Sequence, residues 1–358
     1  MKKLIALFLC LIMTVALVPA LAVNEDVEGT VGIYSSMYPF VIDMMDEALK
    51  AEFPNLTPAY GDTFFFYAGT STLITKVYGE METGTLGCDM LMVAEPAFSL
   101  ELKEAGYLQP IEVEGADTLL RFPYDAEGYW YPVRVCNMVL GYNPEMEAEW
   151  AAKGVTIPKT FKDFAFDTSL NGYISMGNPM TSGTTFAGIA SLTQEDHYGY
   201  AYLDGLKANN VMIESGSTAC TKLQTGECAC IMILEESILK IQKEAADAGA
   251  PITNLAVIYP EDGVILIPST VMTVAEEHSA NCSIEACEAI ENWLLSEAAQ
   301  KLILEGYMHS VFAGMKDIPY NSVDTDGLIE KDLGVDWINA DTNRTEINTQ
   351  WTERVTTN

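Results

Sequence analysis

The sequence predicts an α/β protein built as two lobes, each around a mainly parallel sheet. The chain has 358 residues, enough for about two domains of ordinary size. Hydrophobic residues make up 49% of it and charged residues 20%, which supplies ample material for packed cores. From Gly29 onward, short β-branched runs alternate with amphipathic helical stretches, as they do in βαβ units.

The first unit alternates regularly between strands and helices. Three stretches place apolar residues at helical spacing, and each follows a short β-branched or aromatic run. Gly106, at the end of the third stretch, is typical of a helix C-terminus. We predict strands at 30–34, 63–67 and 89–93, and helices at 38–53, 71–82 and 98–105.

The second unit repeats this alternation and leads into a polar C-terminal tail. In the tail, Ile347 and Trp351 stand four residues apart and would share one helix face, which predicts a short docked helix with a loose lead-in. Periodicity does not decide whether the chain crosses between the units once or twice. We predict strands at 133–142, 173–176, 212–213, 229–234, 255–259 and 264–268, and helices at 160–166, 184–193, 198–209, 237–248, 284–295 and 298–305.

The N-terminus has the pattern of a secretory signal peptide. A basic pair at residues 2–3 precedes an almost wholly apolar run at 4–18, and residues 20–22 form the small-x-small pattern of a cleavage site. We therefore expect export to the periplasm or the extracellular space, with cleavage after Ala22. An uncleaved anchor helix is the less favoured alternative, because the apolar run falls short of about 20 residues and meets Pro19.

The chain is strongly acidic. It carries 51 Asp and Glu against 19 Lys and Arg, a formal charge of −32, which becomes −34 when residues 1–22 and their two lysines are removed. Phosphate backbones and anionic lipid surfaces attract basic patches. We therefore expect no nucleic-acid partner and no direct membrane insertion.

Cysteine usage implies no disulfide framework. Seven cysteines follow the apolar leader, and an odd number cannot pair completely within one chain. Cys228 and Cys230 would share one face of a strand, which suits a soft metal, but no second pair of Cys or His ligands lies nearby in the sequence. Buried apolar thiols are the favoured interpretation.

Three loops that follow predicted strands are rich in hydroxyls and small residues, namely 34–36, 68–72 and 178–185. Ligands bind at the carboxyl ends of strands in open α/β sheets, where helix N-termini offer unpaired N–H groups to anions. Ser and Thr also simply cap helices. Three such loops in corresponding positions make a binding cleft and simple capping about equally good explanations.

Two further segments place charged side chains near the predicted cleft. Arg134, one of four arginines, lies on a predicted strand at the junction of the units, where it could bind a phosphate or carboxylate or be neutralised by an internal acid. Glu235 and Glu236 follow a strand and could bind hydroxyls or a cation, or could start a helix. Adjacent carboxylates point in different directions, so we expect no catalytic pair from these two.

The sequence predicts no catalytic apparatus. His197, His278 and His309 stand in separate segments, and no Ser-His-Asp, HExxH, Gly-x-Ser-x-Gly, P-loop or dinucleotide fingerprint accompanies them. We expect surface or structural histidines, no enzyme, no cofactor and no resident metal.

An ordered series of motifs extends over roughly residues 29–351. In this order they resemble the extracellular solute-binding proteins of ABC importers, in the ferric-iron and organophosphate branch. The resemblance implies a periplasmic-binding-protein type II fold, with two lobes joined by two crossing strands and hinge closure on the ligand. The motifs are 31–36 (VGIYSS), 89–96 (DMLMVAEP), 102–110 (LKEAGYLQP), 178–185 (NPMTSGTT), 222–227 (KLQTGE) and 259–263 (YPEDG) leading to 267–269 (IPS).

The same resemblance implies the domain organisation and the partners. Residues 23–130 with 263–318 would form lobe 1, residues 131–262 lobe 2, and 319–358 a tail whose short helix docks on a lobe. The protein would be a monomer that takes a small-molecule solute to the membrane subunits of an ABC permease.

The resemblance also bears on the ligand. Ferric-binding relatives carry a Tyr-Tyr pair where this chain has Ile233-Leu234-Glu235-Glu236, whereas organophosphate relatives bind phosphate with hydroxyls and helix N-termini. The leading hypothesis is therefore a phosphorylated sugar or organophosphonate, the alternative a ferric or other cation, and the remote alternative a secreted hydrolase. The predicted ligand-binding residues are Ser35, Ser36, Thr70, Ser71, Thr181, Ser182, Gly183 and Thr184, with Arg134 for the anion and Glu95 and Glu235 as hydroxyl acceptors.

Overall fold

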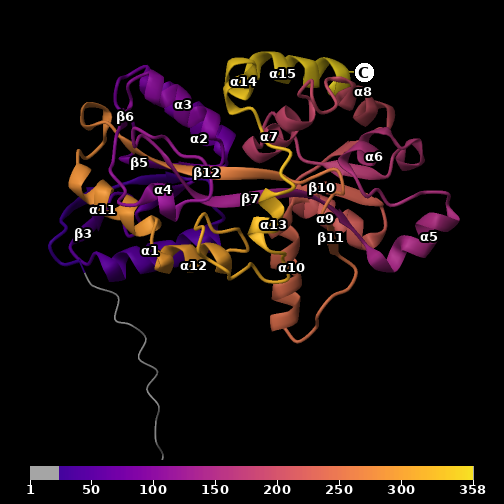
Figure 1. The fold of residues 1–358 in the computed structure, drawn as a ribbon, viewed down its shortest axis with the longest axis horizontal. Helices are drawn as coiled ribbons and strands as arrows, with labels where there is room; N and C mark the ends of the chain where they lie inside the picture. Colours follow the sequence, from indigo (N-terminus) through magenta and orange to yellow (C-terminus); the bar gives the residue numbers. More distant parts are fainter. Residues whose placement is uncertain (1–23, 358) are drawn as a thin grey trace, which may run out of the picture.

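Two α/β halves share one sheet in the computed structural model, which describes residues 24–357 (Figure 1). Among those residues, ten strands form this sheet, and a separate two-stranded sheet lies at the edge of the first half. The α/β class predicted from the sequence is confirmed. No helix in the described part of the chain combines the length and the apolar composition needed to cross a membrane. The predicted signal peptide and its cleavage site lie outside the described residues.

The first half contains parallel strands with helices on both faces of the sheet. Its helix 39–52 starts with a proline at its first turn and buries the apolar face that carries Val41, Met45 and Leu49. Strand β2 lies between β4 and β5 and is parallel to both. The elements are β1 (Gly29–Val31), β2 (Ile33–Ser35), α1 (Pro39–Glu52), β3 (Leu56–Pro58), β4 (Phe65–Tyr67), α2 (Thr70–Met81), β5 (Met90–Val93), α3 (Pro96–Glu104), β6 (Leu108–Gln109) and α4 (Ala116–Leu119), joined later in the chain by η3 (Glu276–His278), α11 (Ile284–Leu294) and α12 (Glu297–Glu305).

The second half repeats this architecture. Strand β8 is parallel to β10 on one side and to β9 on the other. Helices pack on both faces and largely bury β7, β8 and β10, whereas β9 and β11 are only half-buried. The elements are β7 (Tyr131–Tyr142), η1 (Pro144–Met146), α5 (Glu147–Ala152), α6 (Phe161–Phe166), η2 (Thr168–Leu170), β8 (Ile174–Met176), α7 (Gly183–Leu192), α8 (Ala201–Ala208), β9 (Met212–Ile213), α9 (Gly216–Thr225), β10 (Cys230–Leu234), α10 (Glu235–Asp247), β11 (Ala256–Ile258) and β12 (Ile265–Val274).

Strands β7 and β12 run between the two halves as an antiparallel pair (Figure 1). The end of β7 pairs with β10 in the second half, and the end of β12 pairs with β5 in the first. Strand β12 is longer than the predicted 264–268. Its second part was not predicted because hydroxyl residues interrupt the apolar run there. Those hydroxyls are buried and bonded: Thr270 lies 2.7 Å from the hydroxyl of Ser99, and Thr273 donates to Glu291.

The predicted strand at 30–34 is in fact two strands, so that prediction was wrong. Strand β1 pairs with β3, whereas β2 enters the main sheet, and the break falls at Gly32. The N–H of Gly32 donates to Asp89 Oδ2 at 2.7 Å instead of to a neighbouring strand. A Cβ at this position would lie 2.8 Å from the hydroxyl oxygen of Tyr60, so the close approach requires glycine.

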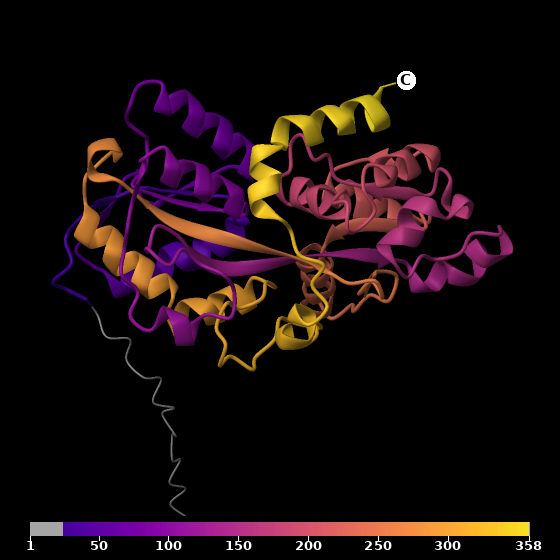
Figure 2. The same ribbon diagram turned by 45° about the horizontal axis from the view of Figure 1, so that its top comes forward.

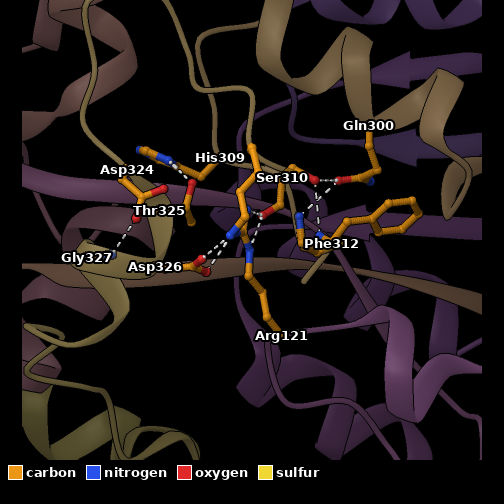
Figure 3. Close-up of polar contacts among 11 residues, drawn as sticks. Arg121, Gln300, His309, Ser310, Phe312, Asp324, Thr325, Asp326 and Gly327 are labelled. Carbon is orange, nitrogen blue, oxygen red and sulfur yellow. Dashed lines mark hydrogen bonds and ion pairs between the residues drawn. The ribbon is translucent and has the colours of Figure 1, made fainter. Parts of the chain in front are cut away.

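The segment at His309 and Ser310 lies beside β7 and is held by polar contacts (Figure 3). The backbone of His309 pairs with Val135 of β7 in both directions, at 2.9 and 3.0 Å. Arg121, after α4, donates to the carbonyl of Ser310 and pairs with Asp326 at 2.9 Å. Asp326 belongs to α13 (Thr325–Ile329), which the sequence did not predict.

The C-terminal tail touches both halves (Figure 2). It contains α14 (Trp337–Thr342), α15 (Arg344–Trp351) and a π-helical turn, η4 (Thr352–Thr356). Helix α14 packs on α3 of the first half, and η4 packs on α8 of the second. Ile347 and Trp351 are buried, which confirms that they share the inner face of one helix. We predicted that the tail docks on one lobe, whereas in the structure it packs on both halves.

The seven cysteines of the described chain are free thiols. Six are buried, and Cys282 is exposed. Burial raises the pKa of the Cys228 thiol to about 12, so this group is protonated at neutral pH. A protonated, buried thiol packs as a small apolar side chain.

Glu291, on α11, should make folding stability depend on pH. Burial raises its pKa to about 8, above the ordinary 4.5, so the folded protein holds a proton that the unfolded chain releases. The stabilisation is complete below pH 4.5 and is lost as the pH rises through 8. Urea unfolding between pH 4 and 9 should show Glu291→Gln removing a slope of about 1.4 kcal/mol per pH unit in that window. Glu285→Gln, an exposed change on the same helix, should leave the slope unchanged; equal slopes in wild type and Glu291→Gln would contradict this account.

Candidate ligand-binding cavity

A cavity of about 660 Å³ lies where the two halves face each other. The first half contributes the loops after β2, β4 and β5, and the second half contributes β7, β10, the start of α10 and the two loops that precede α7 and α9. Its size falls within the range of sites that enclose a small organic molecule. The lining residues that carry polar side chains are Ser36, Tyr38, Tyr67, Thr70, Arg134, Cys136, Asn178, Thr181, Ser182, Thr184, Thr185, Glu214, Ser215, Thr218, Glu236 and Ser237.

Helix N-termini from both halves reach this cavity. Thr70 starts α2, Gly183 starts α7, and Gly216 starts α9, and all three line it. Ser182 and Ser215 cap their helices by accepting from backbone N–H groups at 3.2 and 3.3 Å. The first N–H groups of a helix and the positive end of its dipole both favour an anion. Capping and a cleft, the two explanations of the hydroxyl loops, therefore apply to the same residues.

The cavity wall from β7 includes Arg134. Arg134, Cys136 and Met138 alternate along the strand and all line the cavity. The register between β7 and β12 shifts at Ser269, which faces Arg134, and this bulge leaves Val133 outside the ladder. The carbonyl of Val133 is satisfied by Nε2 of buried Gln300 at 2.8 Å.

Arg134 is a buried cation that lacks a carboxylate partner. Of the four arginines in the described chain, Arg121, Arg344 and Arg354 each form an ion pair with a carboxylate. Arg134, 2% exposed, instead donates through Nη1 to two sulfurs, Cys136 Sγ at 3.3 Å and Met308 Sδ at 2.7 Å. Its Nε has no partner among the described residues. Sulfur is a weak acceptor, so the guanidinium keeps its capacity to bind an anion.

Glu235 and Glu236 point in opposite directions from the start of α10. Glu235 accepts from Asn137, Tyr259 and Ser322 at 2.5–2.8 Å and lies 3.0 Å from His309 Nε2. These donors outweigh burial and lower its pKa. Glu236 lines the cavity, and burial raises its pKa to about 7. Its Oε1 has no partner in the part of the chain that the structure describes.

Seven of the eleven predicted ligand-binding residues line the cavity, and four do not. Ser35 is buried behind the loop and accepts from the N–H of Met37, and Ser71 is not part of the wall. Glu95 pairs with Arg344, and Glu235 is occupied by the contacts just described. The seven that line it are Ser36, Thr70, Arg134, Thr181, Ser182, Gly183 and Thr184.

The sequence analysis missed a fourth hydroxyl loop. Residues 214–218 (ESGST) follow β9 and precede α9, as the other loops follow strands and precede helices. Their Ser, Thr and Gly content is the same signal that marked the other loops. The strand before them has only two residues, which is too short to be recognised from the apolar pattern. Tyr38 was missed as well. Its hydroxyl lies 3.1 Å from that of Ser237, which joins the two halves across the cavity.

The three histidines serve the structure. His197 and His278 bond backbone carbonyls of Ser191 and Gly84 at 2.7 Å, and His309 lies 2.9 Å from Thr325. None of them lines the cavity. Within residues 24–357, no group of three or more His, Cys, Asp or Glu side chains is arranged to hold a metal ion.

The family is shown by a match to the model of bacterial extracellular solute-binding proteins, which extends over residues 88–340. The chain belongs to this family. It is therefore the solute-binding component of an ABC transporter, with a small-molecule ligand and a permease as partners. The comparison with curated proteins found no match to this solute-binding protein.

Solved structures confirm the periplasmic-binding-protein type II fold of this solute-binding protein. Iron-bound HitA from Pseudomonas aeruginosa matches with a TM-score of 0.71 and 19% identity, over 90% of this chain and 99% of HitA. AfuA from Actinobacillus pleuropneumoniae, with fructose-6-phosphate bound, matches with a TM-score of 0.73 and 17% identity, over 92% and 99%. An ABC-transporter substrate-binding protein from Agrobacterium tumefaciens matches with a TM-score of 0.70 and 15% identity, over 94% and 97%.

The contact between α2 and α7 should depend on Gly183. A Cβ there would lie 2.7 Å from Thr70 Cγ2 and 2.9 Å from its Cβ, and side-chain rotation would move the Cγ2 but not the Cβ. Gly183→Ala should therefore force the two helices apart and lower the free energy of unfolding by roughly 1–3 kcal/mol. It should also raise the radius of gyration in small-angle scattering. Gly188→Ala, on the same helix with its nearest atom at 3.6 Å, should leave the scattering unchanged. Identical scattering and melting of the Gly183 variant would show that the helices are not in this contact.

Proposed function

We propose that the solute is a small organic anion, with a phosphorylated sugar or an organophosphonate as the class. The observation that carries this proposal is Arg134, a buried guanidinium that faces the cavity without a carboxylate partner in the described chain. Three helix N-termini surround the same space and favour negative charge. The volume of about 660 Å³ leaves room for an organic group beside the charged one.

The bound fructose-6-phosphate of AfuA supports this class by analogy. The hydroxyl loops of the cavity, which include Thr181 and Ser182, offer a phosphate the donors that it requires. Glu236 offers an acceptor for a hydroxyl or another donor on the organic part.

A cation, ferric iron above all, is the second candidate. It is favoured by the iron-bound HitA and by the ferric binding protein from Campylobacter jejuni among the similar structures. Against it, Arg134 would repel a cation placed in this cavity, and the carboxylate of Glu235 already accepts several hydrogen bonds.

We further propose that the protein works as a monomer with two lobes, 23–130 plus 263–318 and 131–262, that close on the solute. The crossing of β7 and β12 between the halves supports this division. The remaining residues, 319–358, would form the tail. Export with cleavage after Ala22, and the absence of enzymatic activity, remain part of the same proposal.

Removing the Arg134 charge should abolish tight binding. Isothermal titration with fructose 6-phosphate, 2-aminoethylphosphonate, inorganic phosphate and ferric citrate would identify the class that the wild type binds. Arg134→Met keeps the bulk of the side chain and removes the charge. The loss of binding free energy should be about 2–5 kcal/mol. The affinity for the anion should therefore fall roughly 30-fold or more.

Lys301→Met serves as the control for this titration, because Lys301 is an exposed cation on α12 outside the cavity wall. It should bind like the wild type. Ferric iron retained by the purified wild type, without binding of any organic anion, would overturn the proposal. So would turnover of chromogenic phosphate or glycoside substrates by the same sample.

Binding should also depend on the protonation of Glu236. Its pKa of about 7 means that its negative charge, which opposes an anion, appears as the pH rises through neutrality. The affinity of the wild type should fall from pH 6 to pH 8 relative to Glu236→Gln, which carries no charge at any pH. Comparing the two proteins with one ligand cancels the ionisation of that ligand. Parallel pH profiles would contradict the prediction.

A further inference from the structure

The C-terminal strap, residues 334–357, spans the two halves (Figure 2). Its first part is held by the second half, where Ser191 donates to the carbonyl of Gly334 at 2.6 Å. Helix α14 then packs on α3 of the first half. The last turn returns to the second half, where Lys207 donates to the carbonyl of Thr357 at 2.9 Å. The strap therefore connects halves that would move apart if the cleft opened.

Arg344 lies in this strap at the junction of α14 and α15 and contacts both halves. Its guanidinium stacks over the ring of Phe186 in α7, 4.7 Å from the centroid. It also forms an ion pair with Glu95, which directly precedes α3 in the first half. Arg344 therefore bridges Phe186, in the first turn of α7, and Glu95, which follows β5.

Glu95 is buried in this arrangement, with 1% of its side chain exposed. Burial raises its pKa, and the charge of Arg344 opposes that rise. Its second oxygen, Oε2, has no partner among residues 24–357 and lies 3.1 Å from the Cβ position of residue 183. Removing Arg344 would leave a buried carboxylate without compensation at the contact between α2 and α7.

We propose that Arg344 is a positioning residue that clasps the two halves through Glu95 and holds the helix N-termini of α2 and α7 around the solute. It does so without lining the cavity itself. The clasp holds the cleft closed and therefore slows the release of the solute. The effect on release rests on the proposed function; the clasp itself does not.

Arg344→Met tests the clasp in two independent measurements. Small-angle scattering of the purified protein should show a larger radius of gyration than the wild type. Stopped-flow fluorescence with fructose 6-phosphate should show a dissociation rate raised about tenfold or more. Arg344→Lys, which restores a cation, should recover part of both effects. Arg354 lies in the same strap and forms an exposed ion pair with Asp204 of α8. Arg354→Met should change neither the radius of gyration nor the dissociation rate.

A double-mutant cycle with Glu95→Gln separates a clasp from a general loss of packing. If the pair is the clasp, adding Glu95→Gln to Arg344→Met should cause little further change. Additive effects of the two substitutions would overturn the proposal, as would unchanged scattering and unchanged dissociation in Arg344→Met. If neither fructose 6-phosphate nor 2-aminoethylphosphonate binds the wild type, the proposed ligand class fails, and the scattering of the same variants alone decides the clasp.

Discussion

The structure depends on one constraint, the antiparallel pair of β7 and β12 that belongs to both halves. Because each strand begins in one half and ends in the other, the two sheets are continuous, and the cavity forms where the halves face each other across this pair. The bulge at Val133, where the register shifts beside Ser269, lies within this pair of strands. Arg134 projects from this position into the cavity wall, so the same backbone feature that joins the halves also places the cation of the site.

A strongly acidic chain and a site suited to an anion are compatible because they operate at different ranges. The charge of −32 belongs largely to solvated side chains, which salt screens beyond about 10 Å. Inside the cavity, the field comes from helix N-termini and from one guanidinium whose nearest acceptors are sulfurs. The other three arginines are neutralised by carboxylates, which is the fate that the acidic composition would suggest for every arginine.

Predictability differed between elements for physical reasons. Helix α1 was found because its apolar residues follow the period of one buried face, and strand β5 because it is a continuous apolar run that is buried on both faces. The second part of β12 was not, because its buried hydroxyls bond Ser99 and Glu291, partners remote in sequence. The break at Gly32 was equally invisible, since it reflects the approach of Tyr60. Glu95 followed the same rule: the family resemblance suggested a hydroxyl acceptor of the ligand, but Arg344 occupies it.

The sequence by itself determined the α/β class, the hydroxyl loops after strands and the position of Arg134 on a strand, because these follow from local periodicity and composition. Only the tertiary structure decided which of these residues share a cavity, which direction each of Glu235 and Glu236 faces, and that the strap carries Arg344 to Glu95. Those outcomes depend on contacts between residues up to 249 positions apart. Such contacts leave no periodic trace in a single chain, since the packing of the two halves selects them.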